Sequence, residues 1–290
     1  MLLVADSGST KADWTFYDVD GTQTRVTSIG VNPNLHSPAE IQTVLESVCP
    51  VTIQEAKVRE VYYYGTGIWD KRRAAVLGSA LRSCYPNAEV EIHHDLLGAA
   101  RAACGDGPGI ACILGTGSNS CLYDGVKVRD NVTNLGWLIG DEGSGVDLGR
   151  RLIRAYSYRE LPPDDREHFE EETGYNKATI GDGLYGTGNA NRFLASFSPF
   201  IHDNLDRPAI RRLVVASFEE FLTCHVLKYE GAKRLPVSFI GSIAYHYADI
   251  LREVLTEHEL TVGSIKKKPI DALVAYHCPE REPPVHERSN

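Results

Sequence analysis

Two stretches of the chain repeat one pattern of hydrophobic and polar positions. Each has an apolar run, a turn of small residues, a second largely apolar run and an Asp/Gly turn. These segments are 2–5, 6–10, 12–17 and 18–21 in the first copy, and 110–114, 115–119, 120–123 and 124–125 in the second. Short apolar runs bounded by turn residues are typical of buried strands. The pattern therefore predicts two β-hairpins with wide Gly-rich tips, one domain apart, and hence two related domains.

Helical and strand patterns alternate through the rest of the chain. The spacing of apolar residues predicts helices over 39–48, 70–84, 96–103, 145–158, 193–200, 209–227 and 244–258, and strands over 60–65, 90–94 and 237–240. This alternation is typical of an α/β fold with a mixed sheet. Gly and Pro at 105–108 place a boundary there, which gives domains 1–104 and 105–290. We expect the polar tail from about residue 279 to be frayed.

Composition narrows the classes of function. The 290 residues carry 30 Lys and Arg against 39 Asp and Glu, and this net charge of −9 argues against a general nucleic-acid binder. No apolar run approaches the ~18 residues of a membrane span, and the N-terminal apolar run is too short for a signal peptide. The seven cysteines include no CxxC pair, so we expect reduced thiols in a cytoplasmic protein. Gly, with 26 residues in clusters, points to the candidate sites.

The first Gly-rich tip has the chemistry of an anion site. Small residues at 6–11 let backbone N–H groups meet an anion closely, and Ser9, Thr10 and Lys11 add donors and one positive charge. Asp6 suits a Mg²⁺ ion held through water. An ordinary polar hairpin is the alternative. The segment lacks the G-x-x-x-x-G-K-[ST] spacing of a Walker A loop.

The second tip, Gly115-Thr116-Gly117-Ser118-Asn119, repeats this logic. Two such hairpins from two domains could clamp one polyphosphate, and the pair is more specific than either loop alone. A third small-residue turn, Gly241-Ser242, stands where a predicted strand meets a predicted helix. It would let a base or ribose approach the backbone, although a plain strand-to-helix turn is the alternative.

Two further segments carry carboxylates in places suited to chemistry. Asp95 stands where a predicted strand meets a predicted helix, a position typical of a catalytic base, and also of a simple helix N-cap. The adjacent His93 and His94 have no partner at metal-ligand spacing, so we interpret both as structural. The segment 136–145 combines four glycines with Asp141 and Glu142, which suits binding of sugar hydroxyls or a metal.

Together these motifs resemble the N-acetylglucosamine kinase branch of the BadF/BadG/BcrA/BcrD ATPase family, within the sugar kinase/Hsp70/actin superfamily. The resemblance rests on Asp-x-Gly-[ST]-[ST] at 6–10, Gly-Thr-Gly-Ser-Asn at 115–119, Gly-Asp-Glu-Gly-Ser at 140–144 and the late Gly-Ser at 241–242. It implies an α/β protein of two ribonuclease-H-like (actin-like ATPase) domains, each with a mixed sheet, and a nucleotide cleft between them. The dehydratase activators of the same family hold an iron–sulfur cluster, whose cysteine arrangement is not matched by Cys104, Cys112 and Cys121.

The resemblance also implies roles for individual residues. It implies that Asp95 is the catalytic base and that Asp6 holds Mg²⁺. The residues implied to bind ATP are Gly8, Ser9, Thr10, Lys11, Gly115, Thr116, Gly117, Gly241 and Ser242. The residues implied to bind the sugar are Asn34, from Gly30-Val31-Asn32-Pro33-Asn34, and Ser118, Asn119, Gly136 and Asp141.

The function expected from the sequence is an ATP- and Mg²⁺-dependent kinase that phosphorylates N-acetylglucosamine or a related amino sugar at its 6-hydroxyl. Its partners would be the small-molecule sugar and ATP, with no nucleic acid and no membrane, and a homodimer as one option. The alternative within the same fold is an ATPase that switches a partner protein. An aspartic protease is disfavoured, because such enzymes need two Asp-[ST]-Gly loops and the second hairpin has Gly115 in place of the Asp.

Overall fold

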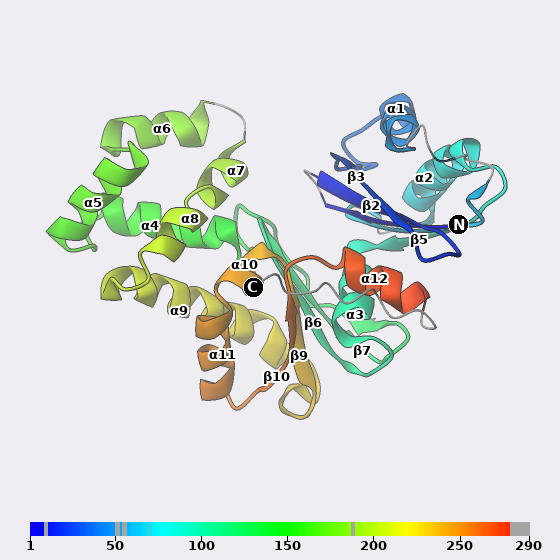
Figure 1. The fold of residues 1–290 in the computed structure, drawn as a ribbon. Helices are drawn as coiled ribbons and strands as arrows, with labels where there is room; N and C mark the ends of the chain where they lie inside the picture. Colours follow the sequence, from blue (N-terminus) through cyan, green and yellow to red (C-terminus); the bar gives the residue numbers. More distant parts are fainter. Residues whose placement is uncertain (9–10, 50–52, 54–56, 69, 187–188, 279–290) are drawn as a thin grey trace, which may run out of the picture. The chain divides into compact units, whose positions relative to one another are not determined.

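The computed structural model describes residues 1–290 apart from 9–10, 50–52, 54–56, 69, 187–188 and 279–290. The chain forms two compact units (Figure 1). Among the described residues, the first contains Met1–Gly105 together with 269–278, and the second contains Asp106–Lys268. The predicted boundary near residue 104 coincides with the first crossing between the units. The predicted tail from residue 279 lies outside the described residues.

The first unit is built on a five-stranded mixed sheet. Its strands follow the order β3-β2-β1-β4-β5, in which β1 is antiparallel to β2 and parallel to β4. Helices α1 and α2 cover one face and α3 and α12 the other (Figure 1). The elements are β1 (Leu2–Ser7), β2 (Lys11–Tyr17), β3 (Gln23–Ile29), α1 (Pro38–Val48), β4 (Glu60–Gly65), α2 (Lys71–Cys84), β5 (Glu89–His94), α3 (Asp95–Cys104) and α12 (Ile270–His277).

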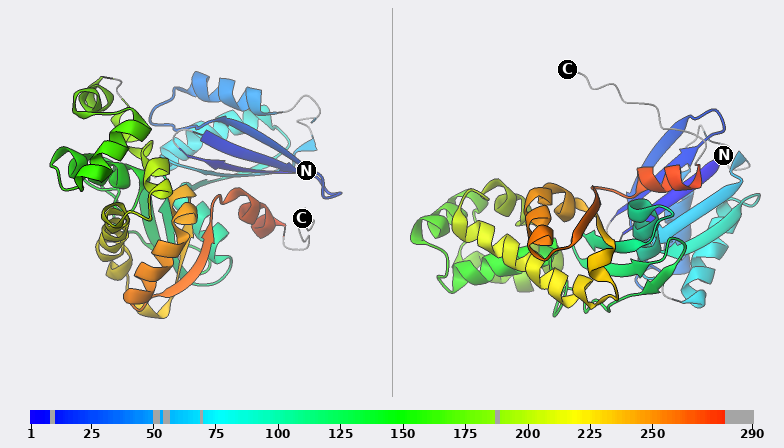
Figure 2. Two further views of the ribbon diagram at one scale, coloured as in Figure 1. Left: turned by 60° about the vertical axis from the view of Figure 1, so that its left-hand side comes forward. Right: turned by 90° about the horizontal axis from the view of Figure 1, so that it is seen from below.

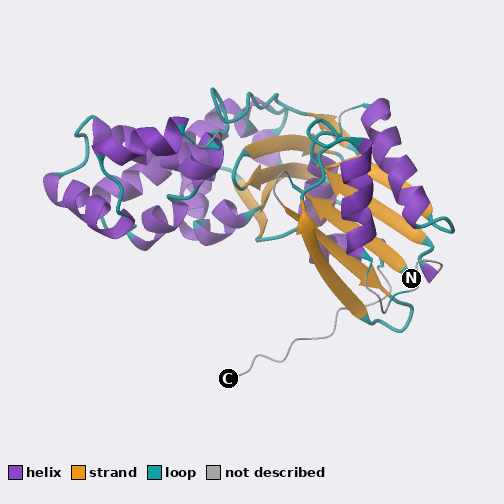
Figure 3. Ribbon diagram, turned by 90° about the horizontal axis from the view of Figure 1, so that it is seen from above, coloured by secondary structure: helices purple, strands orange, loops and turns teal. Residues whose placement is uncertain are grey.

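The second unit contains another five-stranded mixed sheet and a block of helices beside it (Figure 3). The strands are β6 (Gly109–Leu114), β7 (Ser118–Tyr123), β8 (Val128–Asp130), β9 (Pro236–Ile240) and β10 (Thr261–Lys266), in the order β10-β9-β6-β7-β8. The helices are α4 (Gly145–Ser157), α5 (Pro163–Thr173), α6 (Lys177–Tyr185), α7 (Ala190–Ala195), α8 (Ser198–Asp203), α9 (Pro208–Cys224), α10 (Ser242–His246) and α11 (Ala248–Glu257), with 3₁₀ turns η2 (Val226–Lys228) and η3 (Ala232–Arg234). None of the helices in the described ranges is long and apolar enough to cross a membrane.

The two sheets repeat one topology, which confirms the predicted α/β class and the repeated design. In each unit the first strand pairs antiparallel with the second and parallel with the fourth, and the fifth strand extends the parallel side. The two predicted hairpins are β1–β2 and β6–β7. Figure 2 shows the twisted strands of each unit from two further sides. Because β1, β4 and β5 run parallel, as do β6, β9 and β10, each sheet gathers three carboxyl ends at one edge.

The last described helix corrects the predicted domain limits. The prediction placed everything after residue 105 in the second domain, whereas α12 packs on α3, β1 and β2 of the first unit. Its apolar stripe of Ile270, Leu273 and Val274 is buried there. Burial of these side chains drives the return of the chain, since each contributes about 1.5–3 kcal/mol when it leaves water.

The contacts of α12 make one part of the stability pH-dependent. His277 stacks on Tyr62 at 3.6 Å between ring centroids, and its Nε2 lies 2.7 Å from the Tyr64 hydroxyl. Burial, with the nearby charge of Arg101, lowers the pKa of His277 to about 4. An unfolded histidine titrates near 6.5, so between pH 6.5 and pH 4 the unfolded chain binds a proton that the folded chain excludes, and stability falls as the pH falls.

We expect His277→Phe to weaken this pH dependence, since Phe keeps the stacking on Tyr62 but cannot bind a proton. Discounted for the partial exposure of the ring, the loss of unfolding free energy between pH 7 and pH 5 should shrink by about 1 kcal/mol. Urea denaturation of both proteins at the two pH values measures the difference. An equal loss in the variant would show that other groups cause it.

Candidate active site

In the first unit, the predicted site residues gather where the parallel strands end. Ser7, at the end of β1, pairs in register with Gly65 at the end of β4, and Gly65 pairs with His94 at the end of β5. Asp6 and Asp95 therefore stand at the same edge of the sheet. In open α/β sheets this edge is where ligands bind.

Asp95 is the first residue of α3, and it does not cap the helix. The cap is His94, whose Nδ1 accepts the backbone N–H of Leu96 at 3.1 Å. The Asp95 Oδ1 atom is buried and has no hydrogen-bond partner among the described residues, and it lies 2.8 Å from His94 Nδ1. A buried carboxylate oxygen without a hydrogen bond is costly and is characteristic of a functional group.

Close packing brings Asp95 to this edge. An added Cβ at Gly98 would lie 2.8 Å from the Tyr64 ring, so the glycine lets α3 approach β4 closely. On the same strand, Tyr63 is buried and its hydroxyl donates to the Val31 carbonyl at 3.3 Å. Burial raises the pKa of Tyr63, and the charges of Asp6 and Asp95 raise it further. Both carboxylates are thus electrostatically coupled to one buried phenol.

The loop with Asn34 is bound to the same edge. The Ser7 hydroxyl accepts the Val31 N–H at 2.9 Å, which attaches the loop to β1. Asn34 Nδ2 donates to the Gly67 carbonyl at 3.1 Å and to Asn32 Oδ1 at 2.9 Å, and Asn34 Oδ1 accepts from Arg73. The side chain is held in place by these bonds at the end of β4.

The first predicted phosphate loop is described in part. The Gly8 N–H donates to the Lys11 carbonyl at 3.0 Å, which closes the turn. The Lys11 ammonium forms an ion pair with Asp13 at 3.1 Å. Ser9 and Thr10 lie outside the described residues. The contribution of these four residues to ATP binding stays a prediction.

In the second unit, two predicted ATP-binding turns meet at the corresponding edge. Gly241 has φ +130°, and an added Cβ would lie 2.1 Å from the Leu114 carbonyl oxygen, so only glycine fits there. The N-terminus of α4 closes on the other turn, because the Gly145 N–H donates to the Gly115 carbonyl at 2.9 Å and the Val146 N–H to the Thr116 carbonyl at 3.1 Å. These contacts hold Gly115 and Thr116 beside Gly241.

A cavity of about 570 Å³ opens beside these turns, wholly within the second unit. Small residues, among them Gly115, Thr116 and Ser242, line one part of it, and apolar side chains and His202, Asp203 and His246 line the rest. The Tyr247 hydroxyl donates to the Ser198 carbonyl at 2.6 Å and so fixes two walls together. The complete lining is Gly115, Thr116, Gly145, Ala195, Ser198, Pro199, His202, Asp203, Ser242, Ile243, His246 and Tyr247.

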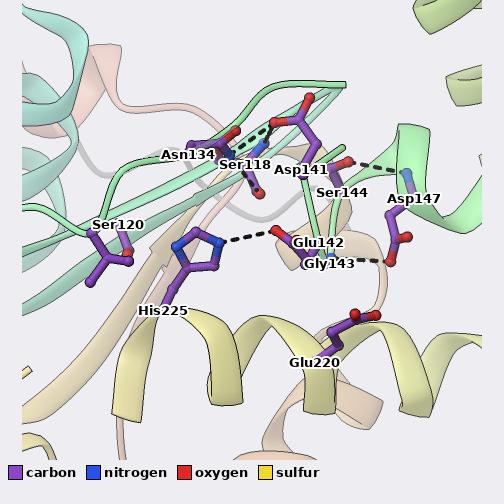
Figure 4. Close-up of polar contacts among 12 residues, drawn as sticks. Ser118, Ser120, Asn134, Asp141, Glu142, Gly143, Ser144, Asp147, Glu220 and His225 are labelled. Atoms are coloured by element: carbon purple, nitrogen blue, oxygen red, sulfur yellow. Dashed lines mark hydrogen bonds and ion pairs between the residues drawn. The ribbon is translucent and has the colours of Figure 1, made fainter. Parts of the chain in front are cut away.

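Three of the four predicted sugar-binding residues of the second unit belong to a network around Asp141, part of which Figure 4 shows. Asp141 Oδ1 accepts the Ser118 N–H at 3.1 Å and Asn134 Nδ2 at 2.9 Å, and Asn134 also donates to the Ser118 carbonyl. The Gly136 N–H donates to Asn134 Oδ1. Asp141 is buried in the left-handed region at φ 59°, and burial raises its pKa. The structure thus brings Ser118, Gly136 and Asp141 together through Asn134.

Asn119 belongs to a different set of contacts. Its Oδ1 accepts the Ser120 N–H at 2.9 Å and Asn131 Nδ2 at 3.0 Å. Successive residues of a strand point to opposite faces, so Asn119 on β7 faces away from its neighbour Ser118. The described contacts therefore do not join Asn119 to the Asp141 network.

Three supporting residues had not been assigned roles from the sequence. Asp147 is buried under the loop 140–145 and accepts from Arg150 at 2.9 Å, while Arg150 also donates to the Gly140 carbonyl at 3.0 Å. His225 is buried, and its Nε2 lies 3.1 Å from the Glu142 carboxylate (Figure 4). Asp147 and His225 are buried polar side chains whose hydrogen bonds hold the Gly-rich loop 140–145 in place. That burial is not visible in the sequence.

Comparison with known proteins agrees with this architecture. No protein-family model and no curated protein matches the chain. A solved structure from Porphyromonas gingivalis, named "Putative N-acetylglucosamine Kinase", is 43% identical, with a TM-score of 0.90 over 97% of this chain and 99% of its own. A second of that name, from Chromobacterium violaceum, is 18% identical, with a TM-score of 0.72 over 95% of this chain and 98% of its own, and shows the shared fold. The chain therefore belongs to the N-acetylglucosamine kinase branch of the BadF/BadG/BcrA/BcrD ATPase family, which its motifs resemble.

Proposed function

We propose that this protein transfers the γ-phosphoryl group of ATP to the 6-hydroxyl of N-acetylglucosamine or a related amino sugar. The observation that carries the proposal is the cavity of the second unit, where Gly115 and Thr116 of one motif and Ser242 of another line a single space. These are the motifs that the family resemblance assigns to ATP. The name of the 43% identical structure supports the sugar.

The cavity suits a nucleoside at one part and phosphates at another. Ile243, Pro199 and Tyr247 supply apolar surface against which a base can stack. Gly115 and the Thr116 hydroxyl in the lining would provide close backbone approach and a donor for phosphate oxygens, and the family resemblance adds Gly117, which lies outside the lining. The N-terminus of α4 next to this turn adds a favourable dipole for negative charge. That the nucleotide lies between the two domains stays a prediction.

Asp95 would act as the general base toward the sugar. Its Oδ1, which has no hydrogen bond in the described structure, can accept the proton of the attacking hydroxyl as that oxygen bonds to phosphorus. Asn34, held by Gly67 and Arg73, would orient the sugar through its amide. Ser118, Gly136 and Asp141 form a second polar group to which the resemblance assigns sugar binding, as it does to Asn119.

The residues present fit a magnesium ion that is bound largely by substrate. No cluster of three or more His, Cys, Asp or Glu able to hold a metal occurs in the described part of the chain. Mg²⁺ in phosphoryl-transfer sites is commonly held by one or two carboxylates plus substrate phosphates, so Asp6 at the end of β1 suffices as the protein's contribution. When bound, the ion would neutralise charge on the β- and γ-phosphates.

A coupled assay of ADP release tests the proposed function. N-acetylglucosamine, glucosamine, glucose and N-acetylmannosamine are compared with a sugar-free control, and the position of the product phosphate is read by NMR. We expect release that depends on an amino sugar and a 6-phosphate product. Equal ADP release with and without sugar would reject the kinase and favour the ATPase that switches a partner protein.

A substitution that fills the cavity should weaken nucleotide binding. Ala195 lines the cavity, and its replacement by Leu would occupy space needed by the base or ribose. We expect the KM for ATP to rise at least about tenfold, equal to ~1.4 kcal/mol, with little change in the KM for sugar. Steady-state kinetics and ATP titration by calorimetry measure this.

The matched control is Ala178→Leu, on the exposed side of α6 and outside the cavity lining. It adds the same side chain and should leave both KM values unchanged. Equal ATP binding by Ala195→Leu and the wild type would place the nucleotide elsewhere.

A further inference from the structure

His94 stands between two groups that compete for one nitrogen. Its Nδ1 accepts the Leu96 N–H at 3.1 Å and so caps α3. The same Nδ1 lies 2.8 Å from Asp95 Oδ1, the buried oxygen that has no hydrogen bond. The imidazole is therefore in contact both with the helix N-terminus and with the proposed catalytic carboxylate.

The two contacts require different protonation states. Nδ1 can accept the Leu96 N–H only through its lone pair, which means that this nitrogen carries no proton. A hydrogen bond to Asp95 would require a proton on Nδ1, and that proton would occupy the lone pair now used by Leu96. Neutral His94 with its proton on Nε2 therefore caps the helix and leaves Oδ1 open, whereas His94 protonated on both nitrogens would release the cap and bond to Oδ1.

We propose that His94 is a positioning residue that controls the availability of the Asp95 carboxylate through this exchange, an inference that rests on the proposed function of Asp95. On acidification, a solvent proton binds Nδ1, the Leu96 N–H loses its acceptor, and the new N–H donates to Asp95 Oδ1. The imidazolium then offsets the negative charge with which the carboxylate attracts the proton of the acceptor hydroxyl. The base is open above the pKa of His94 and covered below it.

The charge next to His94 favours its protonated form. Burial lowers the pKa of His94, but the hydrogen-bonding capacity and charge of Asp95 outweigh burial and raise the pKa above its usual 6.5. One other titratable group is coupled to this carboxylate: Tyr63 on β4, whose hydroxyl is engaged with Val31 and on which the charge of Asp6 on β1 also acts. Protonation of His94 should therefore occur in a pH range that kinetic assays can reach.

The neighbouring His93 provides a matched control. It lies on the same strand, and its Nε2 pairs with the exposed Glu91 carboxylate at 3.0 Å. It neither caps α3 nor contacts Asp95 in the described structure. The variants are His94→Asn and His93→Asn. Asn is a good N-cap residue, so His94→Asn keeps an acceptor for Leu96 but cannot bind a proton.

The decisive measurement is kcat for the sugar-dependent reaction between pH 5.5 and pH 8. We expect kcat of the wild type and of His93→Asn to fall about tenfold per pH unit below the pKa of His94, with the KM for sugar nearly constant. We expect His94→Asn to lose less than about threefold over the same range. An acidic limb in His94→Asn equal to that of the wild type would overturn the proposal.

A second measurement does not depend on activity. Nitrogen-15 NMR of the histidine rings in the wild type should show His94 at high pH with Nδ1 unprotonated, and Asp95→Asn should lower its pKa. No change in that pKa would overturn the proposal even if His94→Asn failed to fold. If the wild type releases no ADP with any sugar, the proposed function fails while this titration still decides the His94–Asp95 exchange.

Discussion

Asp95→Asn is expected to lower kcat about 10³-fold while ATP binding stays nearly unchanged. The amide has almost the shape of the carboxylate but cannot take the proton of the attacking hydroxyl. The Asp95 side chain is only 24% exposed and its Oδ1 has no described hydrogen bond, so it lies ready to accept a proton. Since the cavity proposed for ATP lies within the second unit and Asp95 in the first, the substitution leaves the cavity lining intact.

Steady-state kinetics and calorimetric ATP titration measure these two effects. The control is Glu91→Gln, the same change of acid to amide on the adjoining strand β5, where Glu91 is exposed and bonded to His93. It should retain wild-type kcat. An Asp95→Asn protein with full activity would exclude this carboxylate as the base and return Asp95 to a purely structural role.

Gly149→Ala is expected to destabilise the second unit by about 3 kcal/mol, which lowers Tm by roughly 6–12 °C. Gly149 lies on α4 where the backbone of α7 crosses, and an added Cβ would lie 1.9 Å from the Leu194 carbonyl oxygen and 2.6 Å from its carbon. Backbone atoms on a packed helix cannot move aside as the end of a flexible side chain can. The two helices would have to separate, and this would open the core around Leu152 and Phe197.

Gly181→Ala is the matched control, and its expected effect has the opposite sign. Gly181 also lies within a helix, α6, but an added Cβ there would meet nothing within 4 Å. Alanine is the better helix former by about 1 kcal/mol, so the variant should be slightly more stable. Thermal and urea unfolding of the two variants test the pair. Equal stability changes would show that the α4–α7 contact has no influence.

Local sequence patterns predict most of the fold. The hairpins and the parallel strands β4, β5, β6 and β9 were found where expected, from largely apolar runs or, in β5, from alternation of Val90 and Ile92 with polar residues. Two of the missed elements have weak apolar patterns: β3 alternates between exposed and half-buried positions, and α5 buries only Asp165 and Phe169. The helix expected over 244–258 is divided into α10 and α11 at Tyr247, whose hydroxyl bonds to Ser198 on another helix.

The sequence also predicts the positions of some candidate site residues in the fold, but not all of the contacts between them. The motifs located Asp6, Asp95, Gly115 and Gly241 at strand ends, because small residues and carboxylates stand out after apolar runs. They did not locate Asn134, which joins three of the proposed sugar-binding residues from an irregular loop. Nor did they indicate that His94, rather than Asp95, would cap α3.

The sequence by itself determined the local conformations of this protein: the repeated hairpins, the turns that need glycine, and the carboxylates placed at the ends of strands. These follow from the side-chain period and the backbone freedom of neighbouring residues, which are local properties. Only the tertiary structure decided that α12 returns to the first unit, that Gly115 and Ser242 line one cavity, and that His94 approaches Asp95 Oδ1. The first two bring together residues that are far apart in the chain. The third depends on the burial of Asp95 Oδ1 by surrounding elements, so no local pattern predicts any of the three.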